Sequence, residues 1–258
     1  AKKALRAARS GWTKAQLKQE ASRHYDPYWQ GLHVSAHVDL AEMLRELEQS
    51  GDAGDVLIRL HPDEDRDATC AFFAMGDHPG IFARVAGALA LVGANVVDAR
   101  SYTTKDGYVT DAFWIQDSEG RPYEASRLPR LTQMIHKTLK GEVVARDALK
   151  SRDKVKKREK AFNVPTHITF DNEGSEIYTI IEVDTRDRPG LLYDLARALA
   201  ATNVYIANAV IATYGVQVVD TFYVKDMFGL KYHSESKQKT LEGKLRTAIT
   251  EGAKRANT

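Results

Sequence analysis

Cysteine is almost missing from this sequence of 258 residues, in which Cys70 is the only one. A single thiol cannot form a disulfide within the chain, so a disulfide-stabilised scaffold is excluded. Such cysteine usage is typical of a reducing compartment, and we expect a cytoplasmic protein. No apolar run approaches the roughly 18 residues of a membrane-spanning helix, and we expect no membrane partner. A formal net charge of only +2 provides no overall field that would attract nucleic acid.

Sequence motifs of catalysis are missing as well. There is no phosphate-binding loop of the G-x-x-x-x-G-K-[ST] type and no serine-centred G-x-S-x-G turn. His33 and His37 are four residues apart and would share one face of a helix. A metal pair is conceivable there, but no carboxylate completes a known zinc motif, and we interpret both as surface or packing histidines. We therefore expect neither a catalytic residue nor a metal site in this chain.

The sequence contains instead an internal repeat. The segment D-H-P-G-I-F at residues 77–82 returns 110 residues later as D-R-P-G-L-L at residues 187–192. After a one-residue deletion the match resumes at Asp111 and Asp220. Two copies at this spacing predict a duplicated domain rather than a solenoid of short repeats.

Each copy predicts strands alternating with helices that carry an apolar stripe, and Asp106-Gly107 between two strand patterns is a strong hairpin signal. The predicted strands of the first copy are 56–60, 68–75, 95–104 and 108–116, and its helices are 79–93 and 128–139. The predicted strands of the second copy are 166–170, 177–184, 205–213 and 216–225, and its helices are 189–202 and 236–250. The resulting division is a helical segment 1–54, a first domain 55–145, a basic helical extension or linker 146–163 and a second domain 164–258.

The repeated D-x-P-G motif predicts a strand end, a tight turn and a helix start. Proline suits the first helical position, and Asp77 or Asp187 could cap the free amides. Gly80 and Gly190 lack a Cβ, so a ligand could approach the backbone closely. Unpaired amides at a helix N-terminus suit an anion such as a carboxylate. An ordinary capped helix start is the alternative, and two copies in matching contexts favour a ligand site.

With these residues each copy resembles an ACT domain, the small-molecule sensor module with a ferredoxin-like βαββαβ fold. The second copy is the sharper match, through T-I-I-E-V at 179–183, the motif at 187–192, T-Y-G at 213–215 and V-D-T-F-Y-V at 219–224. The resemblance implies an α+β fold of two ferredoxin-like domains with antiparallel sheets, preceded by a short helical segment. It also implies that ligands lie where two units meet, between the strand-to-helix turn of one and the second strand of the other.

Together the copies resemble the tandem ACT region that ends the bifunctional PII uridylyltransferase/uridylyl-removing enzymes, the bacterial nitrogen sensors. The segment from R-H-Y at 23–25 to His37 resembles the part that follows their HD domain. The resemblance implies a regulatory region that senses L-glutamine. Its partners would be the upstream HD and nucleotidyltransferase domains and, through the full-length enzyme, the PII signalling protein.

The enzymatic parts of such a protein are not in this sequence. It has no His-Asp dipeptide and no Gly-Ser pair followed by Asp-x-Asp, so transferase and hydrolase chemistry, with its Mg and UTP, would lie upstream. Because the chain begins at Ala1 within a helical pattern, we expect a fragment of a longer protein. The alternative function is a stand-alone tandem ACT protein that acts through protein–protein interaction.

An α-amino acid offers a carboxylate and an ammonium group, and the repeat suggests partners for both. The carboxylate could bind the backbone amides at the start of either helix, and the ammonium group could bind a side-chain oxygen near the start of the next strand. The candidate ligand-binding residues are Asp77, His78, Gly80, Ile81, Asn95, Asp98, Asp187, Arg188, Pro189, Gly190, Leu191 and Asn208. The residues alone specify a small zwitterion, and the resemblance implies glutamine.

Two further acids, Asp111 and Asp220, share a strand face with phenylalanine, where a carboxyl group must find hydrogen-bond donors. We expect each to make a structural hydrogen bond, to Thr103 or Thr213, rather than a ligand contact.

The remaining segments predict how the units are connected. Residues 1–54 are expected to pack as helices on the sensor domains or on a neighbour outside this chain. The basic stretch 146–160 is interrupted by three acids and favours a solvated helix or linker over a nucleic-acid site. Because no strand follows helix 236–250, we predict that strand 56–60 crosses over to complete the second sheet, while strand 166–170 completes the first.

Overall fold

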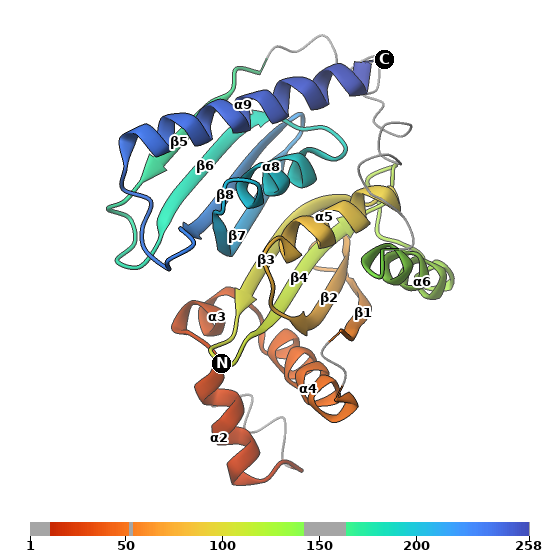
Figure 1. Ribbon diagram of the computed structural model, residues 1–258. Coiled ribbons are helices and arrows are strands. Elements are labelled where there is room, and N and C mark those ends of the chain that lie inside the picture. The colour runs from red at the N-terminus through yellow and green to blue at the C-terminus, as the bar shows by residue number, and fades with distance from the viewer. Residues whose placement is uncertain (1–10, 52–53, 142–163, 258) are drawn as a thin grey trace.

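The computed structural model describes residues 11–51, 54–141 and 164–257, which form a helical N-terminal segment and two α+β units (Figure 1). The N-terminal helices are α2 (Lys14–Arg23), α3 (Asp26–Gly31) and α4 (Val34–Ser50). The first unit contains β1 (Val56–Asp63), β2 (Ala68–Gly76), α5 (Ile81–Leu91), β3 (Asn95–Thr103), β4 (Tyr108–Gln116), the short 3-10 helix η1 (Ala125–Arg127) and α6 (Leu128–Leu139). The second unit contains β5 (His167–Asp171), β6 (Thr179–Arg186), α8 (Leu191–Ala200), β7 (Tyr205–Tyr214), β8 (Gln217–Lys225) and α9 (Glu235–Asn257). The basic stretch 146–160 lies outside the described residues.

Each unit is an antiparallel four-stranded sheet, with strand orders β1-β2-β4-β3 and β5-β6-β8-β7. The predicted α+β class, with its two antiparallel ferredoxin-like sheets, is therefore confirmed. The order along the chain is nevertheless ββαββα in both units, because the edge strand precedes the unit instead of following its second helix.

The predicted strand exchange is wrong. Strand β1 pairs with β2 of its own unit, with Val56 opposite Met75, and β5 pairs with β6 of its own unit, with His167 opposite Asp184. The turn between β1 and β2 is short, and the amide of Asp67 donates to the carbonyl of Glu64 at 3.3 Å. A hairpin closed by so short a loop costs little chain entropy, whereas an exchange would bring together segments far apart in the sequence.

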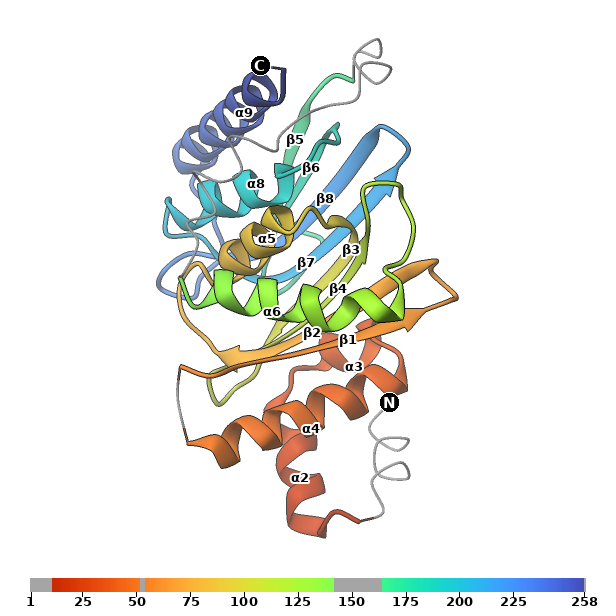
Figure 2. The same ribbon diagram turned by 90° about the vertical axis from the view of Figure 1, so that its right-hand side faces the viewer.

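The two units meet edge to edge. Strands β3 and β7 lie against each other, α5 packs on α8, and the helices cover the same side of both sheets (Figures 1 and 2). One hydrophobic core runs through both units, with the rings of Phe82 and Phe222 in an edge-to-face contact at 6.5 Å. Because this shared core crosses the boundary, the pair forms one folded body.

The N-terminal helices cover the other face of the first sheet. Leu40 and Leu44 of α4 and Tyr28 of α3 are buried in a second core with Phe72 and Trp114 of the sheet. For this reason β2 is buried on both faces, whereas buried and more exposed residues alternate along β6. The segment thus packs on the first unit, one of the two expected possibilities.

The paired histidines separate within this segment. His33 begins α4 and its ring accepts a hydrogen bond from the amide of Ser35. His37 is fully buried against the ring of Tyr28, at 4.5 Å between centroids, and burial lowers the pKa of His37 to about 4. His37 is therefore a packing histidine, and within the residues that the structure describes no group of three or more potential ligands could hold a metal ion.

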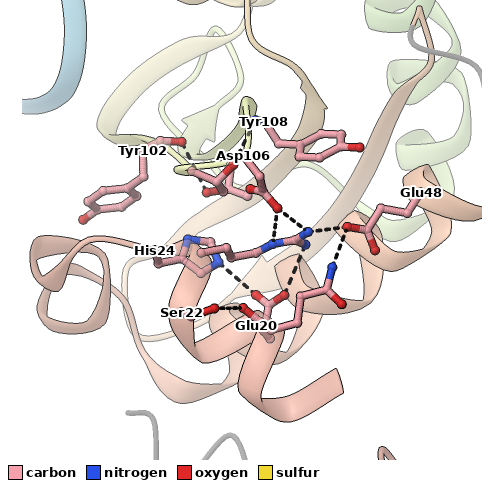
Figure 3. Close-up of polar contacts among 11 residues, drawn as sticks. Glu20, Ser22, His24, Glu48, Tyr102, Asp106 and Tyr108 are labelled. Atoms are coloured by element: carbon pink, nitrogen blue, oxygen red, sulfur yellow. Dashed lines mark hydrogen bonds and ion pairs between the residues drawn. The ribbon is translucent and has the colours of Figure 1, made fainter. Parts of the chain in front are cut away.

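Arg23 joins the N-terminal helices to the β3–β4 hairpin through its contacts with Glu20, Glu48 and Asp106, the three acids labelled in Figure 3. Its guanidinium is 3% exposed and forms ion pairs with Glu20 at 3.3 Å, Asp106 at 2.7 Å and Glu48. The backbone carbonyl of Arg23 also accepts from the amide of Lys105 at 2.8 Å. Residues of α2, α4 and the hairpin thus converge on one buried cation.

A buried carboxyl group lies in the first sheet as well. Asp111 of β4 is fully buried, and Ser101 of the neighbouring strand β3 donates to its Oδ1 at 2.6 Å. The expected structural hydrogen bond therefore exists, but it comes from Ser101 and not from Thr103. Burial raises the pKa of Asp111 to about 7, against the lowering effect of the Ser101 hydrogen bond.

Removal of the Arg23 side chain should destabilise the fold strongly. We expect Arg23→Ala to lower the free energy of unfolding by about 3–5 kcal/mol, because the buried carboxylate of Glu20 loses its cation. The matched control is Arg59→Ala: Arg59 also bridges several acids, but 26% of its side chain is exposed, and we expect a cost of about 0–1 kcal/mol. Denaturant unfolding measures both, and equal losses would contradict the anchoring role of Arg23.

The buried Asp111 predicts a pH dependence. Its pKa in the folded state lies above the unfolded value near 3.8, so its favourable contribution is present at low pH and is lost as pH rises toward about 7. Asp111→Asn keeps the hydrogen-bond acceptor but cannot ionise. The stability of this variant relative to wild type should rise between pH 4 and 7, by at most about 1.4 kcal/mol per pH unit. Denaturant unfolding across this range provides the measurement, and a flat difference would disprove the assignment.

Candidate ligand site between the two units

The repeated Pro-Gly pair forms a tight turn before each helix. The amide of Ile81 donates to the carbonyl of His78 at 3.1 Å, and the amide of Leu191 donates to that of Arg188 at 3.2 Å. Gly80 and Gly190 have φ values of 81° and 73°. Proline followed by a residue of positive φ is the signature of a type II β-turn, which favours glycine at that position.

This turn corrects the predicted helix start. Helices α5 and α8 begin at Ile81 and Leu191, two residues after each proline, and the glycines are their N-caps. Neither helix has a side-chain cap, so Asp77 and Asp187 do not cap the amides as expected. The carboxylate of Asp77 instead accepts a hydrogen bond from the hydroxyl of Tyr205.

Two cavities lie at the interface between the units, each against one copy of the turn. Cavity 1, of about 440 Å³, lies between the start of α8 and the beginning of β3. Cavity 2, of about 390 Å³, lies between the start of α5 and the beginning of β7. The repeat relates them, because Asn95 of cavity 1 is equivalent to Tyr205 of cavity 2. Both combine the turn of one unit with the third strand of the other, which is β3 or β7.

Cavity 1 has a polar floor. Asp220 of β8 is 1% exposed and lines the cavity, and its Oδ1 has no hydrogen-bond partner among the described residues. The hydroxyl of Thr213 on β7 also lines the cavity and likewise has no partner there. Burial, followed by the nearby Asp187 carboxylate, raises the pKa of Asp220 well above its usual value. Asp220 and Thr213 therefore contribute two buried oxygens that have no hydrogen-bond donor among the described residues.

Cavity 2 lacks this open floor because a side chain covers it. The hydroxyl of Tyr205 donates to Oδ2 of Asp77 at 2.5 Å and also forms a hydrogen bond with Thr103. The equivalents of these two residues, Asp187 and Thr213, line cavity 1, whereas Asp77 and Thr103 do not line cavity 2.

The predicted site residues fall into three groups. Those that line cavity 1 are Asn95, Asp187, Arg188, Pro189, Gly190 and Leu191. Those that line cavity 2 are His78, Gly80 and Ile81. Those that line neither are Asp77, which is bonded to Tyr205, Asp98, which is paired with Arg66 and Arg100, and Asn208.

Arg188 is held by its own unit. Its guanidinium pairs with Asp194 of α8 at 2.6 Å, and Arg255 of α9 binds the same carboxylate at 2.7 Å. Helix α9 passes so close that a Cβ added to Gly252 would meet the Arg188 guanidinium at 1.8 Å. The side chain of Arg188 thus fastens the turn to α9.

Sequence reasoning missed the floor of cavity 1 and the tyrosine of cavity 2. Asp220 and Thr213 were expected to bond each other as structural groups, yet both residues line the cavity, and the Oδ1 of Asp220 and the hydroxyl of Thr213 have no hydrogen-bond partner among the described residues. The repeat alignment contains a signal for this difference. Ser101, which donates to Oδ1 of Asp111, is replaced by Ile211 in the second copy, so Asp220 has no hydroxyl opposite it.

Within the residues that the structure describes, no helix combines the length and apolar character needed to cross a membrane.

Known protein families match both units. Residues 71–120 match the model of the ACT domain, and residues 167–254 match the model of an ACR9-like, ACT-like domain.

Curated relatives extend the match over almost the whole chain. A bifunctional uridylyltransferase/uridylyl-removing enzyme of Ruegeria pomeroyi is 82% identical over 99% of this chain and 28% of that protein. Enzymes of the same name are 70% identical in Cereibacter sphaeroides, over 99% of this chain and 27% of that protein, and 36% identical in Rhodospirillum rubrum, over 96% and 26%. The chain thus spans about a quarter of the length of these relatives. With two ACT-like units and this similarity, the chain belongs to the ACT-domain family, as the tandem ACT region of a bifunctional uridylyltransferase/uridylyl-removing enzyme.

Proposed function

We propose that this region senses glutamine for a uridylyltransferase/uridylyl-removing enzyme that controls nitrogen metabolism, and that cavity 1 is the sensing site. The observation that carries the proposal is the composition of cavity 1, which joins a helix N-terminus to an acidic floor with an unpartnered buried oxygen. The carboxylate of a zwitterion can bind the helix N-terminus, and its ammonium group can bind the acidic floor. The volume of about 440 Å³ lies within the usual range of small-molecule sites.

The carboxylate end of the ligand fits the start of α8. The amide of Leu191 is used inside the turn, but Gly190 and Leu192 line the cavity beside it. Within the described part of the chain, no backbone acceptor is recorded for the amides of Gly190 and Leu192. Amides at a helix N-terminus attract a carboxylate through their hydrogens and through the helix dipole. The predicted role of Gly190 is therefore kept, and Leu192 replaces Leu191 as the second donor.

The ammonium and amide ends fit the remaining walls. The carboxyl groups of Asp220 and Asp187 are suited to an ammonium group, and Asn95 together with the turn at residues 117–120 supplies polar groups on the wall of the first unit. A ligand bound there touches both units at once. Occupancy would therefore act on their relative arrangement, which is the kind of change a regulatory region transmits.

The same proposal concerns the upstream domains, the partner protein and the compartment. Glutamine bound here would regulate the upstream HD and nucleotidyltransferase domains, which would use Mg and UTP and act on the PII signalling protein. Cys70 is a buried free thiol, which agrees with a cytoplasmic setting. The alternative, a stand-alone tandem ACT protein, is less well supported because the relatives carry this region within much longer chains.

Calorimetric titration of the 258-residue chain with L-glutamine tests the proposal. We expect saturable binding of glutamine and at least roughly tenfold weaker binding of L-glutamate, because a site fitted to an amide leaves groups unpaired when it receives an acid. D-glutamine is the control for the orientation of the carboxylate and ammonium groups. Equal binding of glutamine and glutamate, or no binding of either, would reject glutamine sensing.

A further inference from the structure

We propose that the Tyr205 hydroxyl occupies, in cavity 2, the position that the ammonium group of a bound amino acid takes in cavity 1. The first residue of β3 or β7, which is Asn95 or Tyr205, would then decide which of the two repeat-related cavities is open to a zwitterion. The inference rests on the proposed amino-acid sensing by cavity 1 and concerns how the two sites differ.

The first support is the equivalence of the partners. In cavity 2 the Tyr205 hydroxyl donates to Asp77 at 2.5 Å and bonds the Thr103 hydroxyl. The repeat equivalents of these two partners are Asp187 and Thr213, and both line cavity 1. Asn95 stands where Tyr205 stands in the other copy, and it has a shorter side chain with no hydroxyl group. The hydroxyl of Thr213 has no hydrogen-bond partner among the described residues, so an added donor would supply to Thr213 what Tyr205 supplies to Thr103.

The second support is the pair of repeat-equivalent buried acids, Asp111 in the first unit and Asp220 in the second. Asp111 receives a hydrogen bond from Ser101 at 2.6 Å, whereas the strand partner of Asp220 is Ile211, which has no hydroxyl. A buried carboxyl oxygen without a donor carries a free-energy cost that a cationic donor would remove. The second unit therefore has two separate places, at Asp220 and at Thr213, where an internal donor present in the first unit is missing.

The lining of cavity 2 agrees with a closed site. Tyr205 is bonded to Asp77, and the cavity retains mainly apolar walls, such as Phe82, Ala196, Ala200 and Ile206. The ammonium group of a zwitterion entering cavity 2 would have to displace the tyrosine from Asp77. The Tyr205 hydroxyl instead links the turn region of the first unit to β7 of the second, so this contact has a structural role between the units.

Asn95→Tyr is the test, because it copies into cavity 1 the residue that closes cavity 2. We expect the full 258-residue chain carrying Asn95→Tyr to lose glutamine binding by at least roughly 100-fold in Kd and to melt at a higher temperature than wild type. The rise in Tm distinguishes new internal hydrogen bonds from simple disruption. Asn95→Ala is the matched control, because it removes the same amide but leaves the cavity open, and its Kd should change by less than about tenfold.

A second pair of variants keeps the inference testable if the tyrosine at position 95 does not fold. Ile211→Ser supplies Asp220 with the hydroxyl that Asp111 already has, and glutamine binding should weaken by about tenfold. Tyr205→Phe removes the hydroxyl from cavity 2, and it should lower the Tm while the Kd of cavity 1 stays within about twofold of wild type.

The outcomes separate the two proposals. If wild type binds glutamine and Asn95→Tyr binds it equally well, the stand-in role of Tyr205 is wrong and the sensing function remains. If Tyr205→Phe weakens glutamine binding as much as Asn95→Tyr does, cavity 2 is itself a ligand site and the inference fails. If wild type binds no glutamine, the proposed function fails and the inference fails with it.

Discussion

The packing of β3 against β7, together with α5 against α8, is the constraint on which the other features of this region depend. It continues one hydrophobic core across both units and fixes their relative orientation (Figure 2). Because the units are copies, each brings the same turn against the start of β3 or β7 of the other. Two related cavities are the direct result of this interface, and neither could exist in an isolated unit.

The two cavities differ because only a few equivalent positions have diverged. Tyr205 in place of Asn95, and Ile211 in place of Ser101, change which buried acids find donors inside the protein. A buried polar group without a partner is costly, so its presence at Asp220 indicates a position that gains from an added ligand. Duplication thus supplied the geometry, and changes in hydrogen-bond partners distinguish the proposed binding site from a structural contact.

The first unit is also supported from its other side. Helices α2 to α4 cover the outer face of its sheet, and the buried Arg23 joins them to the β3–β4 hairpin (Figure 3). Strand β3 of the same hairpin begins at Asn95, on the wall of cavity 1. The N-terminal segment and the candidate site are therefore connected through one strand of continuous backbone.

The sequence by itself determined the repeat, the α+β class, most strand and helix positions and the importance of the Pro-Gly turn, since these depend on residues that are close in the chain. It led to a wrong strand exchange and to the wrong capping residues, because edge pairing and turn geometry compete with equally plausible local alternatives. Only the tertiary structure decided that Asp220 and Thr213 line a cavity while Asp77 and Thr103 form hydrogen bonds with Tyr205. The physical reason is that satisfaction of a buried polar group depends on side chains about 100 residues away, such as Thr103 and Tyr205, which only packing between the units brings together.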